Sequence, residues 1–170
     1  LFEIALNPQI KIHELPGKNI IGFARTEKTS AVLFNNGIVL KRAGNEQKIT
    51  LSQLKNWQEQ YVRNANLPLP KHQDDFYELD YSTKAADIDF YDLKVSKNNF
   101  WVNTNIGVFA IKESGELNRY LPLHSEEINF TKTGNLIETN PYGGVRVYSN
   151  LDLLKYTHFE KDNAQTPTMV

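Results

Sequence analysis

The chain has 170 residues, 40% of them hydrophobic and 11% aromatic, a composition that suits one domain with a packed, β-rich interior. Nineteen Lys and Arg residues are balanced by twenty Asp and Glu residues, so no basic surface for nucleic acid or anionic lipid is expected. The sequence contains no cysteine, which excludes disulfide scaffolds, thiolate metal sites and cysteine nucleophiles.

The N-terminal segment predicts two strands, residues 1–6 and 9–15, separated at Pro8. No signal peptide is visible, and no apolar run reaches the roughly 20 residues of a membrane-spanning helix. The first residue is Leu1, so we interpret the start as a processed or truncated end and expect the chain to be a piece of a longer protein.

Residues 23–40 predict the first of three similar units. Each unit reads as a short strand, a polar turn, a second strand, a turn rich in Asn and Gly, a third strand and a weaker fourth strand. In this unit the Asn-Gly turn is Asn35-Asn36-Gly37. Asn and Gly tolerate the positive φ of tight hairpins, so the pattern is typical of an antiparallel meander.

A helix is predicted after the first unit, within an insertion of about residues 50–82. Thr50 is a good N-cap, and Gln53 completes a capping box. One apolar face follows at helical spacing, with Trp57 and Tyr61 expected to pack against the sheets. Residues 76–81 alternate in hydrophobicity and predict a strand.

An acidic stretch follows the helix. We interpret it as a solvated strand edge rather than a calcium site, because the glycine and terminal glutamate of a calcium loop do not appear together with it. Its members are Asp74, Asp75, Glu78, Asp80, Asp87, Asp89 and Asp92.

The second and third units repeat the first. Residues 93–110 superpose on residues 23–40 at an offset of 70, which places Gly107 on Gly37 and Asn105 on Asn35. Residues 128–147 match the second unit at an offset of 35 up to Asn140. Two extra residues then shift the offset to 37 and place Gly144 on Gly107.

The predicted fold is therefore mainly β, with four-stranded antiparallel blades of the β-propeller type and one inserted helix. The units cover about residues 20–49, 91–123 and 128–159 of a single domain. A closed propeller needs at least four blades. Either the chain is a fragment of a larger ring, or its sheets close in a smaller, atypical way.

The second unit carries a family resemblance. Residues 99–109, NFWVNTNIGVF, resemble the repeat of two-component regulator propellers: an apolar strand with Trp101, then Thr104, two turn residues, Gly107 and another apolar strand. Trp101 occupies a core position of its strand in this repeat, so we expect it to be buried. The third unit lacks the Trp and has a longer turn. The first unit has Ala31 and Phe34 where the repeat has Trp and Thr.

The resemblance implies the periplasmic sensor region of a hybrid two-component regulator of the Bacteroidetes type, which responds to oligosaccharides. It implies a periplasmic or extracellular location. The kinase, receiver and DNA-binding parts of such regulators are absent from this sequence, so signalling output and membrane attachment would lie outside this chain.

Neither catalytic nor cofactor motifs emerge from the sequence. No serine lies in a nucleophile elbow, and no Walker or dinucleotide-binding loop occurs. The four histidines, His13, His72, His124 and His158, are far apart, so no metal site is predicted. We expect neither enzymatic activity nor a cofactor.

The ligand-binding candidates lie in and beside the Asn-Gly turns. Tyr142 sits in the longer third turn near Asn140 and Arg146, where an exposed aromatic ring suits stacking on a ligand. Asn105 would share a rim with Asn140, although turn formation alone explains both asparagines.

We therefore expect a non-catalytic ligand-sensing or interaction module whose partner is an oligosaccharide or a protein, and not nucleic acid. The alternative is a stand-alone secreted or surface scaffold that uses the helical insertion for contact. A third interpretation is a carbohydrate-active enzyme, which needs a converging pair of carboxylates. Open sheet edges would favour a homodimer.

Overall fold

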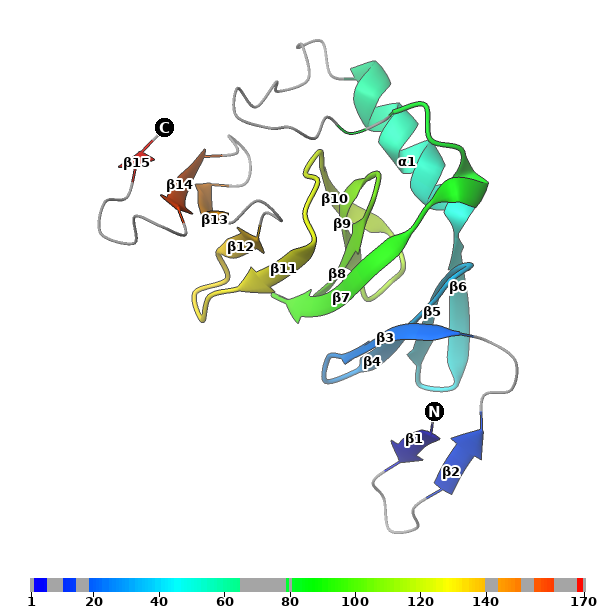
Figure 1. The fold of residues 1–170 in the computed structure, drawn as a ribbon. Coiled ribbons are helices and arrows are strands. Elements are labelled where there is room, and N and C mark those ends of the chain that lie inside the picture. The colour runs from blue at the N-terminus through cyan, green and yellow to red at the C-terminus, as the bar shows by residue number, and fades with distance from the viewer. Residues whose placement is uncertain are drawn as a thin grey trace.

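In a computed structural model, which describes residues 2–5, 11–14, 19–64, 79, 81–139, 144–150, 155–160 and 168–169, the chain is mainly β. Its strands form consecutive antiparallel sheets, and one α-helix occurs in the described part (Figure 1). The expectation of a mainly β, antiparallel protein with an inserted helix is confirmed. None of the described helices has the length and apolarity needed to cross a membrane.

Each sheet is a meander in which neighbouring strands in the chain pair with each other. A two-stranded pair comes first, as predicted for the segments on either side of Pro8, with β1 (Phe2–Ala5) and β2 (Lys11–Glu14). The first sheet contains β3 (Ile20–Arg25), β4 (Thr29–Phe34), β5 (Gly37–Arg42) and β6 (Asn45–Thr50). The second sheet contains β7 (Phe90–Ser96), β8 (Asn99–Thr104), β9 (Gly107–Lys112) and β10 (Leu117–Leu121). The third contains β11 (Glu127–Phe130), β12 (Leu136–Thr139), β13 (Gly144–Asn150), β14 (Lys155–Glu160) and β15 (Thr168–Met169).

The strand registers confirm the repeat between the first two sheets and correct its alignment in the third. Leu93 pairs with Val102, and Phe23 pairs with Val32, at the expected offset of 70. In the third sheet the equivalent of Val102 is Glu138, at an offset of 36 instead of 35. The next strand then follows the expected offset of 37, because Arg146 takes the place of Phe109.

A longer turn explains this shift. β7 and β8 are joined by the two-residue turn Lys97-Asn98. In the β11–β12 hairpin, the Thr131 N–H donates to the carbonyl of Asn135, and this pair encloses a turn of three residues. Gly134 adopts φ +84° in the longer turn, and its N–H donates to the carbonyl of Thr131 at 2.9 Å. A glycine with positive φ is typical of three-residue hairpin loops.

The helix α1 (Leu51–Asn64) begins as the capping box predicts. The Thr50 N–H donates to Gln53 Oε1 at 2.9 Å, and the Gln53 N–H donates to Thr50 Oγ1 at 3.2 Å. A short 3₁₀ helix, η1 (Ala85–Asp87), follows in the chain and contacts α1. Of the strand expected over residues 76–81, most lies outside the described residues, while Leu79 has no regular secondary structure and Tyr81 lies in a turn.

The apolar face of α1 packs on the second sheet, as expected for Trp57 and Tyr61. The Trp57 ring lies 6.4 Å from that of Phe109, and the Tyr61 ring lies 4.9 Å from that of Tyr120. Gln58 is fully buried, and its amide donates to the carbonyl of Ile106 at 3.1 Å. The helix therefore covers the end of the second sheet where β8 turns into β9.

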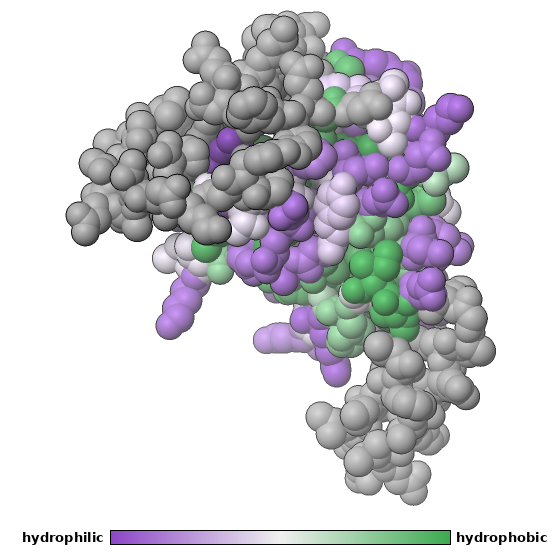
Figure 2. Space-filling view, in the orientation of Figure 1, coloured by the Kyte–Doolittle hydropathy of each residue, from purple (hydrophilic) through white to green (hydrophobic). Residues whose placement is uncertain are grey.

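Two interfaces join the three sheets, and β3 and β11 each lie against β7. The first interface, between the first and second sheets, is an apolar cluster that includes Leu33, Ile38, Phe100 and Phe109. The second interface, between the second and third sheets, contains Trp101, which is buried as predicted. On the other face of the first sheet, apolar residues form a smaller cluster, and Figure 2 shows a hydrophobic patch over this part of the molecule.

Candidate functional site

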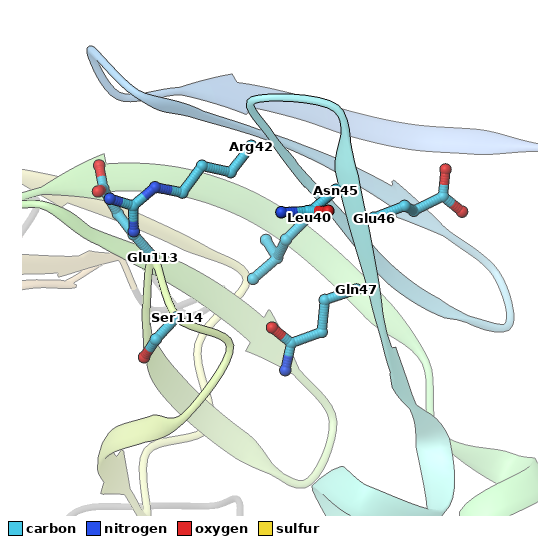
Figure 3. Close-up of a pocket in the computed structure, with 7 residues that line it drawn as sticks. All are labelled: Leu40, Arg42, Asn45, Glu46, Gln47, Glu113 and Ser114. Atoms are coloured by element: carbon cyan, nitrogen blue, oxygen red, sulfur yellow. The ribbon is translucent and has the colours of Figure 1, made fainter.

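Two clefts open on the same rim of the molecule, each between successive sheets. This cleft rim carries the β5–β6, β7–β8, β9–β10 and β11–β12 turns. The first cleft, of about 420 Å³, lies between β5–β6 and the β9–β10 turn (Figure 3). The second cleft, of about 390 Å³, lies between the second and third sheets. Both volumes fall in the range of roughly 300–1,000 Å³ typical of ligand sites.

The first cleft has a mixed charge. Arg42 and Glu113 line it from opposite sheets, and Figure 3 shows their side chains extending toward each other. The Thr26 hydroxyl donates to Glu113 Oε1, which ties the β3–β4 turn to the β9–β10 turn. Glu46 also lines this cleft, but its carboxylate points away from the other lining side chains and lies 3.8 Å from Lys41 Nζ.

The second cleft is crossed by Lys97. Lys97 and Asn98 adopt φ of +50° and +59°, values that L residues rarely take. A Cβ built on Gly134 would lie 2.2 Å from Lys97 Cε, so the lysine stem lies directly on the bare backbone of the β11–β12 turn. Lys97 thus reaches from the second sheet onto the third, and the missing side chain at residue 134 provides the space.

Aromatic residues form the wall of the second cleft. The Trp101 ring lies 5.0 Å from the Phe130 ring, and its Nε1–H donates to the carbonyl of Ser96 at 3.3 Å. Tyr148 lines the cleft from β13. These contacts hold the Trp101 ring in one orientation, because the buried indole packs against Phe130 and its N–H already has an acceptor.

A buried polar cluster lies directly behind Tyr148. The Tyr148 hydroxyl donates to Glu138 Oε2 at 2.5 Å, and Arg146 Nη1 lies 3.8 Å from the same oxygen. All three side chains are at least 95% buried. Burial raises the pKa of the Tyr148 hydroxyl above its ordinary value, and the neighbouring Glu138 carboxylate raises it further. Tyr148 is therefore held in its neutral, donating form.

The four ligand-binding residues predicted from the sequence are not gathered in either cleft. Asn105 lies at the opposite rim, where its Oδ1 accepts from the Asp89 N–H at 3.0 Å and its Nδ2 donates to the Asp87 carbonyl at 2.9 Å. Arg146 belongs to the buried cluster behind the second cleft and is only 4% exposed. Asn140 and Tyr142 lie outside the described residues. The assignment of these four residues to a ligand stays a prediction.

The acidic stretch is described only in part. Asp87 and Asp89 are exposed, and an Asp92 oxygen lies 3.1 Å from Lys94 Nζ. Among the described residues, no group of three or more His, Cys, Asp or Glu side chains could hold a metal ion. Asp74, Asp75, Glu78 and Asp80 lie outside the described residues, as do the side chains of His13, His72 and His158.

Sequence reasoning missed the cleft residues. Lys97, Asn118, Arg119 and Asn135 line the second cleft, yet they lie in turns and on an outer strand with no recognisable motif. One signal was available, since Lys97-Asn98 forms a two-residue hairpin turn without glycine. Their convergence depends on how two sheets pack, which the local sequence does not encode.

No family model and no curated protein matches the chain. Solved structures do. The extracellular domain of a proposed one-component system, BT4673 of B. thetaiotaomicron, is 16% identical with a TM-score of 0.55, over 94% of this chain and 20% of that one. The extracellular domain of a proposed hybrid two-component system, BT3049 of the same organism, is 12% identical with a TM-score of 0.49, over 92% and 20% of the two chains.

A protein of unknown function from Bacteroides caccae is 13% identical with a TM-score of 0.43, over 78% of this chain and 43% of that one. The chain therefore spans about a fifth of the two extracellular domains and less than half of the third protein. At these identities the likeness is one of fold. It rests on the BT4673 domain, whose TM-score is above 0.5.

Proposed function

We propose that this chain is a non-catalytic ligand-sensing or interaction module, formed by propeller-type blades of an extracellular or periplasmic sensor. The observation that carries the proposal is the second cleft, whose lining residues come from two different sheets. A ligand bound there would contact both sheets at once, so binding would favour one relative placement of the sheets over others.

The fold supports this proposal. Antiparallel meanders placed side by side, two of them four-stranded and with β7 between β3 and β11, suit blades around a common axis. The likeness to the extracellular domain of BT4673 extends over nearly the whole chain. Any output would pass to segments beyond this chain.

The enzyme alternative lacks a suitable pair of carboxylates in the described clefts. Glycoside hydrolysis requires two carboxyl groups that converge on one bond. In the first cleft, Glu113 accepts from Thr26 while the Glu46 carboxylate points away (Figure 3). We therefore propose that the protein releases a bound saccharide without modifying it chemically.

A titration of the isotopically labelled chain with a panel of neutral and acidic saccharides tests this function. We expect amide chemical shifts to change at the cleft rim, while chromatography of the ligand after incubation shows no product. Product formation would establish the enzyme alternative. A panel that moves no amide resonance would overturn ligand sensing and favour the scaffold alternative.

A further inference from the structure

We propose that the second cleft binds a small acidic ligand, one that carries a carboxylate or sulfate group on a hydroxyl-rich frame, with Lys97 pairing with the anionic group. This inference rests on the proposed ligand-sensing function and specifies the ligand class and the residues that select it.

The two clefts differ in the charge of their lining residues. The described residues that line the second cleft include two cations, Lys97 and Arg119, and no carboxylate. The described lining of the first cleft places Arg42 with Glu46 and Glu113. A cleft lined by charges of one sign concentrates ligands of the opposite sign, whereas mixed charges cancel. The second cleft therefore favours an anion and the first does not.

Lys97 is positioned for this role. Its stem is held against Gly134, and within the described part of the chain its ammonium forms no ion pair. Its backbone adopts the left-handed conformation that costs free energy in a non-glycine residue. The turn thus directs a cation to the boundary between two sheets, where an anionic group of a ligand can pair with it.

The neutral lining residues suit hydroxyl groups. Asn99, Asn118 and Asn135 contribute side-chain amides, and Ser96 and Ser149 contribute hydroxyls. An amide offers both donors and an acceptor, which complements a hydroxyl that donates and accepts in turn. The amides of Asn118 and Asn135 make no hydrogen bond to other described residues, so they remain available to a ligand.

The nearest buried carboxylate does not oppose this charge. Glu138 lies behind Tyr148, where it accepts from the tyrosine hydroxyl and is paired with Arg146. Its negative charge is offset by the Arg146 guanidinium, so Glu138 does not cancel the positive charge of Lys97.

Two-dimensional NMR of the labelled chain, titrated with D-glucuronic acid, D-glucose and sodium sulfate, tests the proposal. We expect glucuronic acid to move the amide resonances of Lys97, Asn118 and Asn135. Glucose should bind about tenfold more weakly, because it lacks the charged group. Added salt should weaken glucuronic acid binding.

Matched variants locate the charge. Lys97→Gln removes the charge but keeps a polar, unbranched stem, and it should weaken glucuronic acid binding about tenfold. Arg42→Gln, on the same rim but in the first cleft, should leave the affinity unchanged. Equal losses in both variants would overturn the site and show a general effect of surface charge.

The outcomes separate this inference from the function on which it rests. Binding of glucose as tight as that of glucuronic acid would overturn the acidic-ligand inference but support ligand sensing. Sulfate alone binding as tightly as glucuronic acid would mean an adventitious ion only, and would overturn the inference as well. No response to any of the three compounds in the cleft overturns the inference. The function itself fails only if the wider saccharide panel also moves no amide resonance.

Discussion

The two interfaces between the sheets solve the same packing problem in different ways. In the first interface, the second sheet presents Val102, Phe109 and Ile111 to the first sheet. In the second interface, the third sheet presents the structurally equivalent residues Glu138, Arg146 and Tyr148 to the second. The same positions of one repeat can thus be filled by hydrophobic side chains or by a buried polar cluster.

This difference has physical consequences. An apolar interface tolerates changes that preserve volume, because dispersion and burial are non-directional. A buried ion pair depends on each partner, since removing one leaves a charge without compensation. The second interface should therefore be the more sensitive of the two to single substitutions, and it is also the one that carries the proposed site.

The largest effect is expected for Arg146→Met, which leaves the Glu138 carboxylate buried without its cation. We expect a loss of about 3–5 kcal/mol in the free energy of unfolding, measured by urea denaturation. The double variant Glu138→Val with Arg146→Phe copies the second sheet and should recover most of this loss. As a control, Arg63→Met removes the exposed pair with Glu59 on α1 and should cost about 0.5 kcal/mol or less.

A pair of tyrosine variants compares the interfaces directly. Tyr148→Phe removes a hydrogen bond to a carboxylate and should cost about 1.5–3 kcal/mol. Tyr120→Phe removes a bond of 2.7 Å to the carbonyl of Ile106, a neutral acceptor, and should cost about 0.5–1.5 kcal/mol. Equal losses in thermal or urea unfolding would contradict the distinction between the two interfaces.

Asn105→Ala tests the rim opposite the clefts. It removes the two side-chain hydrogen bonds that hold residues 87–89 against the β8–β9 turn, and leaves the backbone bond from the Asn105 N–H to the Asp89 carbonyl. We expect a loss of about 1 kcal/mol in the free energy of unfolding, with unchanged binding at the second cleft. A weaker ligand affinity at unchanged stability would instead restore Asn105 as a binding residue.

The smallest effect at neutral pH, and the one that grows only in alkali, concerns the buried tyrosines. Burial raises the pKa of Tyr81 to about 12 and also raises those of Tyr120 and Tyr148. In the unfolded chain these hydroxyls ionise near pH 10, approximately. Their contribution to stability is therefore complete below about pH 10 and is lost as the pH rises through the folded pKa values.

Urea unfolding from about pH 8 to about pH 11 would measure this loss. Tyr148→Phe should reduce the alkaline loss of stability, because the phenyl ring cannot ionise. An unchanged profile in this variant would show that Tyr148 does not contribute to it.

Local chemistry made much of the fold predictable. The capping box at Thr50 and Gln53, the turns before Gly37 and Gly107, and the buried position of Trp101 all follow from short-range patterns, and the structure confirms them. The register of β12 was not predictable from aligning similar residues of the repeats, because the extra residue is accommodated in the turn before Leu136 and not in the strand.

The candidate site was less accessible to sequence reasoning. The sequence places Arg146 near Tyr142 as a ligand-binding candidate, but alternation along β13 turns its side chain inside, beside Glu138. Lys97 and Gly134 are 37 positions apart in the sequence, and their contact exists only because the second and third sheets pack together. Tertiary packing, which the repeat pattern does not specify, determines the site.

The three-residue loop at Gly134 bears on how such a protein could diversify. It accommodates an added residue without moving Ile128 or Leu136 out of the interior. Insertions and deletions at this rim would therefore leave the alternation of the strands intact while changing the outline of the cleft. Lineages of such repeats could acquire new ligand preferences by drift in loop length, with the interior under separate selection.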